Sequence, residues 1–389
     1  MFLGDCKEQL KELPDNYVDS IVTDPPYGIN FMGKKWDYDV PTVEMWEECL
    51  RVLKPGGHLL SFAGTRTQHR MCVNIEDAGF EIRDMIAWVY GSGFPKSLDI
   101  SKAIDKAAGA EREVVGIDER YNEPSGIVNA GRGPKARTKI QREITTSKTD
   151  EAKQWEGWGT AIKPSLEPIT LARKPFKGTV AANVLKHGTG GLNIGESRVG
   201  TEEMTEGRAV QGDSGVYAWN TGVDNSKPNE NPTTKTGRFP ANLIHDGSEE
   251  VLELFPEVHG AGSKREAGQA KQDGEGGLFG VGNHDGNGMR FGDSGSAARF
   301  FYCAKTDKND RNGTTDNNHP TVKPKLLMKY LVRLVTPKGG IVLDPFMGSG
   351  STGKAAALCK MRFVGVELEE ETMEVAKQRI KSAYEYYKH

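Results

Sequence analysis

The residues best suited to chemistry form the run Asp24-Pro25-Pro26-Tyr27, which directly follows a short apolar segment. Proline ends a strand, so the run predicts a carboxylate at the carboxyl end of a strand, where ligands bind in open α/β sheets. The two prolines donate no backbone hydrogen bond, which leaves the carbonyls of Asp24 and Pro25 free to accept hydrogen bonds from a ligand. The alternative is a rigid strand exit with a surface tyrosine.

A second candidate site is the glycine-rich run from Asp344 to Lys354, between a predicted strand and a predicted helix. Its glycines would let a ligand approach the backbone at a helix N-terminus. It matches the dinucleotide pattern GxGxxG, with Glu367 closing the next strand. It also matches most of a P-loop, but Ala355 stands where a magnesium-binding hydroxyl is required. The third candidate ligand is S-adenosylmethionine, and Glu367 would then bind its ribose hydroxyls. The remaining alternative is a glycine-rich turn that binds no ligand.

The two runs together favour a methyltransferase, because a dehydrogenase has no use for the loop after the first strand. They resemble the S-adenosylmethionine-dependent amino-methyltransferases of DNA, which act on adenine N6 or cytosine N4. The resemblance lies in a catalytic motif, a segment before the cofactor strand and a cofactor motif: Asp24-Pro25-Pro26-Tyr27, His319-Pro320-Thr321-Val322-Lys323-Pro324 and Phe346-Met347-Gly348-Ser349-Gly350. The motif order is similar to the β group of this family, and parts of the middle region look like phage and prophage members.

The resemblance implies a role for each of these residues. Asp24 and Pro25 would accept the two hydrogens of an adenine amine, Pro26 would help to shape the loop, and Tyr27 would stack on the flipped base. Cofactor binding would fall to a larger set: Asp5, Cys6, Lys323, Asp344, Phe346, Gly348, Gly350, Thr352 and Glu367. A capping role is the alternative for Asp5.

Fewer residues bear on which base is methylated. Trp88 and Tyr90 would wall the base pocket, although aromatic residues in strands more often belong to the core. Aspartate instead of serine at position 24 favours adenine N6 by resemblance, with cytosine N4 as the nearest alternative. A nucleotide-binding module of the P-loop or dinucleotide type, without catalysis, is a third interpretation.

Composition limits the class of protein. The 389 residues are 36% hydrophobic, which indicates a polar, loop-rich part of the chain. A net charge of -3 at pH 7 does not exclude a nucleic-acid partner, because phosphate binding depends on where basic residues cluster. One such cluster could contact phosphates or be a solvated loop: Arg132, Lys135, Arg137, Lys139 and Arg142.

Cysteine and histidine spacing predicts neither a disulfide framework nor a metal site. Apolar runs are too short to span a membrane, and no signal peptide is visible. We therefore expect a cytoplasmic protein of bacterial or phage origin that acts on the DNA of the nucleoid. Double-stranded DNA is the expected partner and a membrane is not, while the resemblance allows a homodimer and a restriction endonuclease partner.

The elements that must position these residues alternate between strand and helix, which predicts a doubly wound, mainly parallel Rossmann-like α/β sheet. Strands are expected at 18–22, 58–63, 82–90, 341–344 and 363–367. Helices are expected at 8–13, 43–53, 67–78, 326–335 and 352–360, with a further one at the carboxyl end of the chain. The sheet would be assembled from both termini, with 1–100 as the catalytic half and 319–389 as the cofactor-binding half. Residues 101–318 would form a large, loop-rich insertion that recognises the target.

Overall fold

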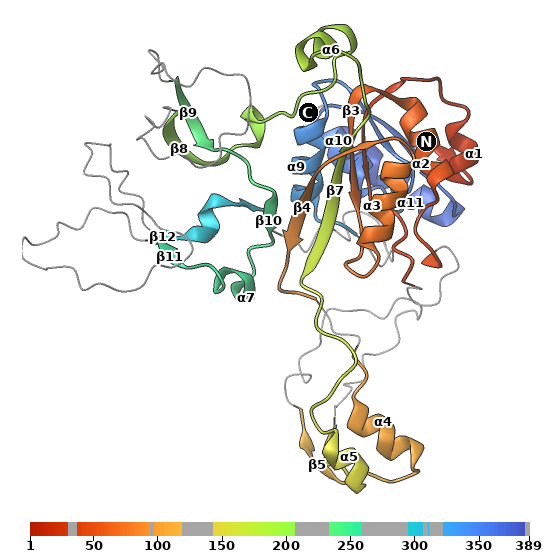
Figure 1. Ribbon diagram of the computed structural model, residues 1–389, viewed down its shortest axis with the longest axis vertical. Coiled ribbons are helices and arrows are strands. Elements are labelled where there is room, and N and C mark those ends of the chain that lie inside the picture. Colours follow the sequence, from red (N-terminus) through yellow and green to blue (C-terminus); the bar gives the residue numbers. More distant parts are fainter. Residues whose placement is uncertain are drawn as a thin grey trace, which may run out of the picture.

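The computed structural model describes residues 1–29, 37–93, 97–118, 143–206, 233–258, 295–305, 310 and 322–385. A nine-stranded sheet lies at its centre in the order β1-β15-β14-β2-β3-β7-β4-β10-β13 (Figure 1). The strands are β1 Phe2–Leu3, β2 Val18–Thr23, β3 Leu53–Phe62, β4 Glu81–Val89, β7 Leu166–Arg173, β10 Leu243–His245, β13 Tyr302–Cys303, β14 Ile341–Asp344 and β15 Arg362–Glu367. Neighbouring strands of this sheet pair in parallel, except that β7 is antiparallel to both β3 and β4. The mainly parallel α/β fold is confirmed.

Helices cover both faces of the sheet. They are α1 Cys6–Leu10, α2 Val43–Val52, α3 Gln68–Asp77, α9 Lys325–Val335, α10 Ser351–Leu358 and α11 Glu370–Glu385. On one face, Trp46 of α2 packs in a cluster with Ile21 of β2. On the other, Leu331 of α9 packs in a cluster with Val22, the next residue of β2. Since successive strand residues point to opposite faces, a fully buried β2 requires helices on both sides.

The middle of the chain also contributes to the sheet. The sequence prediction drew the sheet from residues 1–100 and 319–389, but β7, β10 and β13 lie between those segments and join it. β7 enters near the middle of the sheet, where residues 168–172 are all buried. It was missed because Pro168 and the prolines on either side of the strand made this stretch resemble a loop. The sheet is therefore larger than the two ends of the chain predict, and residue 100 is not its boundary.

One predicted break is instead part of a strand. The Pro/Gly run 54–57 was expected to separate a helix ending at residue 53 from a strand beginning at 58, but α2 ends at Val52 and β3 begins at Leu53. The Lys54 ammonium lies 2.6 Å from a carboxylate oxygen of Asp19, and the Gly56 amide donates to the Lys174 carbonyl at 3.0 Å. Partners from neighbouring segments therefore keep this run extended.

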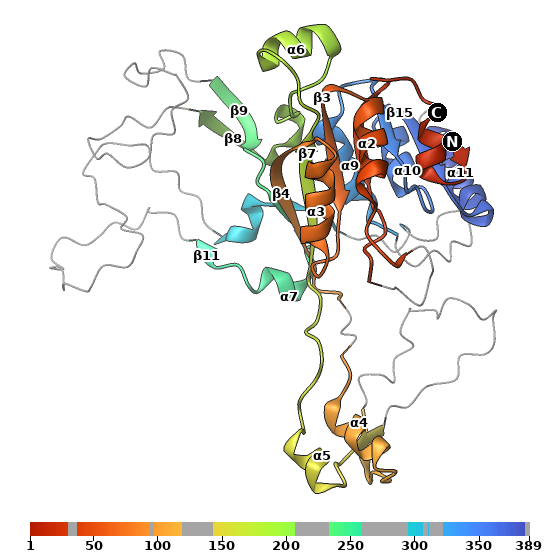
Figure 2. The same ribbon diagram turned by 45° about the vertical axis from the view of Figure 1, so that its right-hand side comes forward.

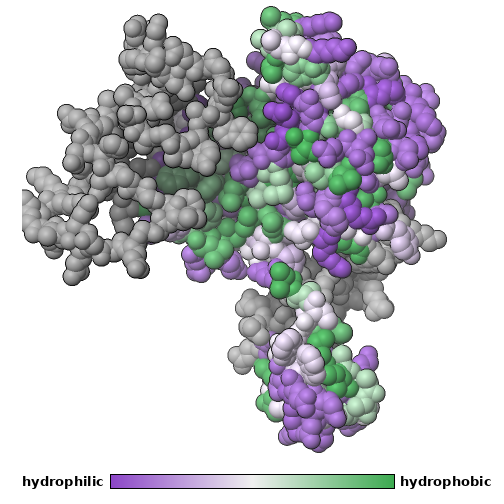
Figure 3. Space-filling model, in the orientation of Figure 1, coloured by the Kyte–Doolittle hydropathy of each residue, from purple (hydrophilic) through white to green (hydrophobic). Residues whose placement is uncertain are grey.

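Between β4 and β7 the chain forms a small outer lobe, which comprises residues 97–118 and 143–163. Its elements are α4 Ile100–Ala107, β5 Val114–Ile117, β6 Glu143–Thr145 and α5 Asp150–Gln154. The buried Asp105 carboxylate holds it together by accepting from Arg112 at 2.6 Å and from the Thr149 amide at 3.0 Å. Figures 1 and 2 place the lobe well away from the sheet, at the end of two extended segments. Apolar side chains reach its surface (Figure 3), and Trp158 is 60% exposed.

The remaining elements lie beside β10 and β13, except Val180–His187, where the Asn183 amide donates to the Pro55 carbonyl of β3. They are α6 Val180–His187, β8 Val199–Glu206, β9 Thr233–Arg238, α7 Glu249–Leu252, β11 Glu257–Val258 and β12 Gly295–Ser296. β8 pairs with β9, and β11 pairs with β12. Across the described ranges, none of the helices is long and apolar enough to cross a membrane.

Candidate functional site

A cavity of about 2100 Å³ lies at the carboxyl ends of β2, β3, β4 and β14. Asp24 and Tyr27 line it after β2, and Gly348 lines it after β14. Because β7 is antiparallel to its neighbours, its first residues lie at the edge where those strands end, and Glu167 lines the cavity there. Trp158 of the outer lobe also lines it. The two runs that the sequence singled out therefore share one cavity, at the predicted edge of the sheet.

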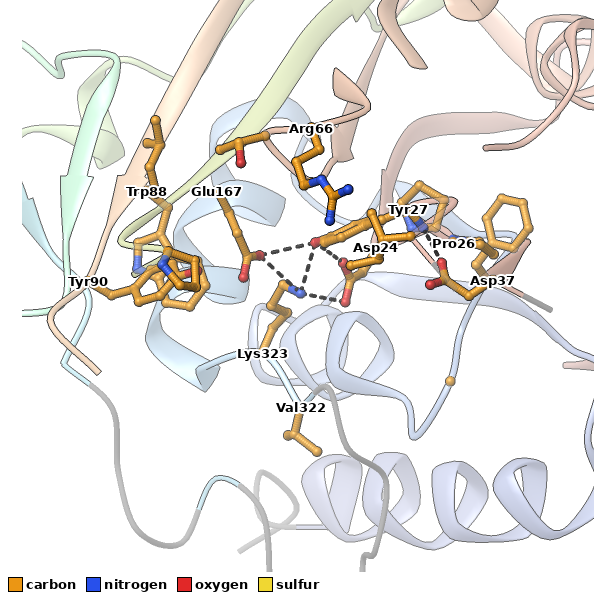
Figure 4. A pocket seen from close by; sticks show the side chains of 18 of the residues that line it. Asp24, Pro26, Tyr27, Asp37, Arg66, Trp88, Tyr90, Glu167, Val322 and Lys323 are labelled. Atoms are coloured by element: carbon orange, nitrogen blue, oxygen red, sulfur yellow. Dashed lines mark hydrogen bonds and ion pairs between the residues drawn. The ribbon is translucent and has the colours of Figure 1, made fainter. Parts of the chain in front are cut away.

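Four side chains in the cavity form one connected group, the Asp24 cluster: Asp24, Tyr27, Glu167 and Lys323 (Figure 4). The Lys323 Nζ lies 2.6 Å from Asp24 Oδ2 and 3.2 Å from Glu167 Oε2. The Tyr27 hydroxyl lies 2.7 Å from Asp24 Oδ1 and 3.1 Å from Glu167 Oε2, either of which can accept its hydrogen. Two carboxylates thus share one ammonium and one hydroxyl.

Burial makes these contacts strong. The side chains of Lys323, Asp24 and Glu167 are only 8%, 19% and 20% exposed. Burial alone would lower the pKa of Lys323, but the carboxylates of Asp24 and Glu167 outweigh it and raise that pKa above its ordinary value. Burial and the same two carboxylates raise the pKa of Tyr27 well above its usual range. At neutral pH the ammonium is therefore charged and the tyrosine hydroxyl is protonated.

The loop that carries Tyr27 is fixed by contacts with nearby segments. The Asp37 carboxylate accepts from the Tyr27 amide at 2.7 Å and from the Gly28 amide at 3.0 Å. The Thr67 hydroxyl donates to the Tyr27 carbonyl at 2.5 Å. A Cβ on Gly64 would lie 3.1 Å from the Tyr27 ring, so this glycine leaves room for the ring. These contacts hold the backbone of Tyr27 and Gly28 against Asp37 and Thr67.

Trp88 and Tyr90 line the cavity next to Glu167, with ring centroids 4.9 Å apart and an interplanar angle of 44°. Trp88 is 7% exposed and also belongs to a core cluster, so the base-pocket and core interpretations of this residue are compatible. It stands directly opposite Glu167 in the β4–β7 pair. Burial and the Glu167 carboxylate raise the pKa of Tyr90.

Six of the nine residues assigned to cofactor binding line the cavity: Asp5, Cys6, Lys323, Phe346, Gly348 and Glu367. Asp5 also caps α1 by accepting from the Lys7 amide at 2.9 Å, as the alternative interpretation expected. Burial raises the pKa of Glu367, which ends β15 with its carboxylate at the cavity. Lys323 contacts Asp24 of the catalytic-motif loop and Glu167 of β7.

The other three assigned residues belong to the glycine-rich run but do not line the cavity. Asp344 is buried, and its carboxylate accepts from the Thr23 hydroxyl at 2.7 Å and from the Phe346 amide at 3.1 Å. Burial raises the pKa of Asp344 to about 6. Thr352 is buried beside it. Gly350 begins α10 with φ of +80°, and a Cβ there would lie 3.0 Å from Ala376. These residues shape the turn and pack it against α11.

Sequence reasoning missed two residues that organise the site, Glu167 and Asp37. The only sequence signal for Glu167 is an acidic residue before Pro168 in a segment that looked like phage relatives. The predicted phosphate-contacting residues Arg132, Lys135, Arg137, Lys139 and Arg142 lie outside the described residues. Within the described ranges, no group of three or more His, Cys, Asp or Glu side chains is arranged to hold a metal ion.

Some of the comparisons with known proteins extend over almost the whole chain, and others cover a short part of it. A family model for N6/N4 DNA methylases matches residues 18–378. The type II methyltransferase M.HindIII of Haemophilus influenzae is 24% identical over 424 aligned positions, which cover 98% of this chain and 94% of that protein. M2.DpnII of Streptococcus pneumoniae is 39% identical over 67 residues, 17% of this chain and 25% of that protein.

Solved structures give a similar list. The complex of M1.HpyAVI with S-adenosylmethionine has a TM-score of 0.39 and 16% identity, and the match covers 97% of both chains. The cytosine-N4-specific PvuII DNA methyltransferase has a TM-score of 0.44 and 13% identity, with 99% of this chain and 90% of that chain covered.

Proposed function

This chain belongs to the family of N6/N4 DNA methylases, and we propose that it transfers a methyl group from S-adenosylmethionine to the N6 amine of adenine in double-stranded DNA. The observation that carries the proposal is the position of Asp24, Pro25 and Tyr27 on the wall of one cavity. A base paired in a duplex cannot reach such a cavity, so the target base must be flipped out of the helix. Aspartate at position 24 supports adenine by resemblance, and cytosine N4 is the nearest alternative.

S-adenosylmethionine is the cofactor, and the chemistry of one wall of the cavity fits it. That wall combines an aromatic ring, Phe346, an open backbone at Gly348 and the carboxylate of Glu367 at the end of β15. An aromatic ring can stack on the adenine of the cofactor, and the carboxylate at the end of β15 can accept hydrogen bonds from its ribose hydroxyls. The bound cofactor supplies an electrophilic methyl group on a sulfonium.

The residues of the chain must make the target amine a better nucleophile, since its lone pair is delocalised into the ring. The Asp24 carboxylate and the Pro25 carbonyl are acceptors for the two amine hydrogens. Among the described residues, no donor forms a hydrogen bond with the Pro25 carbonyl. Both acceptors stabilise the positive charge that develops on the nitrogen as it attacks the methyl group. Trp88 and Tyr90 would flank the base, and the Tyr27 ring would stack on it.

The test is the chemical identity of the product. DNA incubated with the protein and methyl-labelled cofactor should yield labelled N6-methyl-2′-deoxyadenosine on digestion and mass spectrometry. Labelled N4-methylcytosine would show that the target is cytosine N4 instead of adenine N6. The absence of any labelled base would refute the proposal. Asp24→Ala should lower the rate about a hundredfold or more while the protein still binds the cofactor. A rate near that of the wild type would contradict the role of Asp24.

A further inference from the structure

Asp24 is not free to accept a substrate amine in this structure. Its Oδ1 accepts from the Tyr27 hydroxyl at 2.7 Å, and its Oδ2 lies 2.6 Å from the Lys323 ammonium. The ammonium also neutralises the negative charge that should stabilise a positive nitrogen. An incoming amine must therefore compete with Lys323, with Tyr27, or with both.

Glu167 offers both of these donors a second place to bind. Its Oε2 lies 3.2 Å from Lys323 Nζ and 3.1 Å from the Tyr27 hydroxyl oxygen, in each case slightly farther than the Asp24 oxygen. Only a small movement of either donor is needed to exchange one carboxylate for the other. The Lys323 side chain is 8% exposed, so without a second carboxylate it would have no buried counter-ion other than Asp24.

The backbone holds the Glu167 carboxylate in place. Residue 167 pairs with Trp88 of β4, and the Ala63 amide after β3 donates to the Pro168 carbonyl at 3.0 Å. Strands on both sides therefore fix this end of β7. Asp24, by contrast, lies in a loop after β2, and Lys323 precedes α9. The backbone of Glu167 is therefore fixed, and the Lys323 ammonium and the Tyr27 hydroxyl need only side-chain movement to shift toward its carboxylate.

We propose that Glu167 is a positioning residue that takes over Lys323 and Tyr27 when the target amine binds, which releases Asp24 to accept the amine hydrogens. The inference rests on the proposed function. In the exchanged arrangement the ammonium is paired with Glu167, and the Asp24 carboxylate faces the amine with its charge unopposed. No proton is transferred in this exchange, because Lys323 remains an ammonium and Tyr27 remains a phenol.

The experiment compares three variants in single-turnover methyl transfer, with saturating cofactor and DNA. Glu167→Gln keeps the size of the side chain and removes its charge, so Lys323 should stay on Asp24 and the rate should fall on the order of tenfold to a hundredfold. Cofactor affinity and DNA affinity, measured separately, should change less than about threefold. Glu81→Gln is the matched control, because Glu81 pairs with Arg173 across the same two strands, at the end remote from the cavity.

The double variant Glu167→Gln/Lys323→Met separates positioning from a merely structural role. Without Lys323 there is no cation to remove from Asp24, so the double variant should transfer methyl groups faster than Glu167→Gln alone. A double variant no faster than Glu167→Gln would overturn the inference, as would Glu167→Gln at the wild-type rate. In those cases the wild type still methylates DNA, whereas failure of the proposed function would appear as no methylated base with the wild-type protein.

Discussion

Replacing Asp344 with asparagine should change the free energy of unfolding in a pH-dependent way. Relative to the wild type, the variant should be more stable at neutral pH than at acid pH. Asp344 is 2% exposed, and burial raises the pKa of its carboxyl from an ordinary 3.8 to about 6. An asparagine oxygen can still accept from the Thr23 hydroxyl and the Phe346 amide, which bond to Asp344 Oδ1 in the wild type. The substitution therefore removes a buried titrating group and keeps the two hydrogen bonds of Oδ1.

The sign follows from proton binding. Between pH 3.8 and about 6 the folded protein holds the Asp344 proton while the unfolded chain has lost it, so wild-type stability falls as pH rises through this interval. The full loss is about 3 kcal/mol, because one pKa unit corresponds to about 1.4 kcal/mol. The asparagine variant does not lose this amount. Its stability relative to the wild type should therefore rise by most of about 3 kcal/mol between pH 4 and pH 7.5.

Urea unfolding of both proteins without cofactor, at steps between pH 4 and pH 8, measures the difference. The comparison must be between variants, because His58 titrates in the same interval with the opposite sign. Asp77→Asn, at the exposed end of α3, is the control for an aspartate-to-asparagine change outside the core. A flat difference for Asp344→Asn would mean that the carboxyl is not protonated in the folded state, and the argument from burial would fail.

Two further predictions concern stability. Burial, with Arg173 and Arg83 nearby, lowers the pKa of His58 to about 4, so wild-type stability should fall as pH falls from 6.5 toward 4. The variant His58→Gln should remove up to about 3 kcal/mol of that fall in the same urea titration. An unchanged dependence of stability on pH would contradict this prediction. Gly353→Ala should cost about 1 to 3 kcal/mol in thermal unfolding, since the added Cβ would lie 2.7 Å from the Phe363 ring and against Ile380. Ile380→Val should recover part of the loss, and a raised Tm for Gly353→Ala alone would refute the packing argument.

The loop at Asp24 and the turn at Gly348 could be predicted because each depends on a short local pattern. An apolar strand followed by proline or glycine is visible in a few residues, and parallel strands then bring both ends to one edge. The glycines of the turn were harder to assign. Gly350 and Gly353 fit a ligand pattern, but they are needed for close packing against α11. Both requirements select a residue without a Cβ, so the pattern alone cannot distinguish them.

The role of Glu167 could not be predicted, because it depends on which strands become neighbours. Nothing near residue 167 specifies that β7 will lie between β3 and β4. Likewise, the contact of Lys323 with Asp24 spans 299 positions of the chain. Sequence reasoning assigned Lys323 to cofactor binding by resemblance. The assembled sheet places its ammonium next to Asp24 instead. Long-range partners are set by the assembled sheet and leave little trace in local periodicity.

The place of β2 in the sheet has a consequence for how the protein is made. One side of β2 pairs with β3, which follows it closely, but the other side pairs with Val342 and Leu343 of β14. During synthesis on the ribosome, that second side remains unpaired until residues 341–344 have been made. Unpaired strand edges favour aggregation. Nascent chains truncated before residue 341 should therefore depend on chaperones more than the finished protein does.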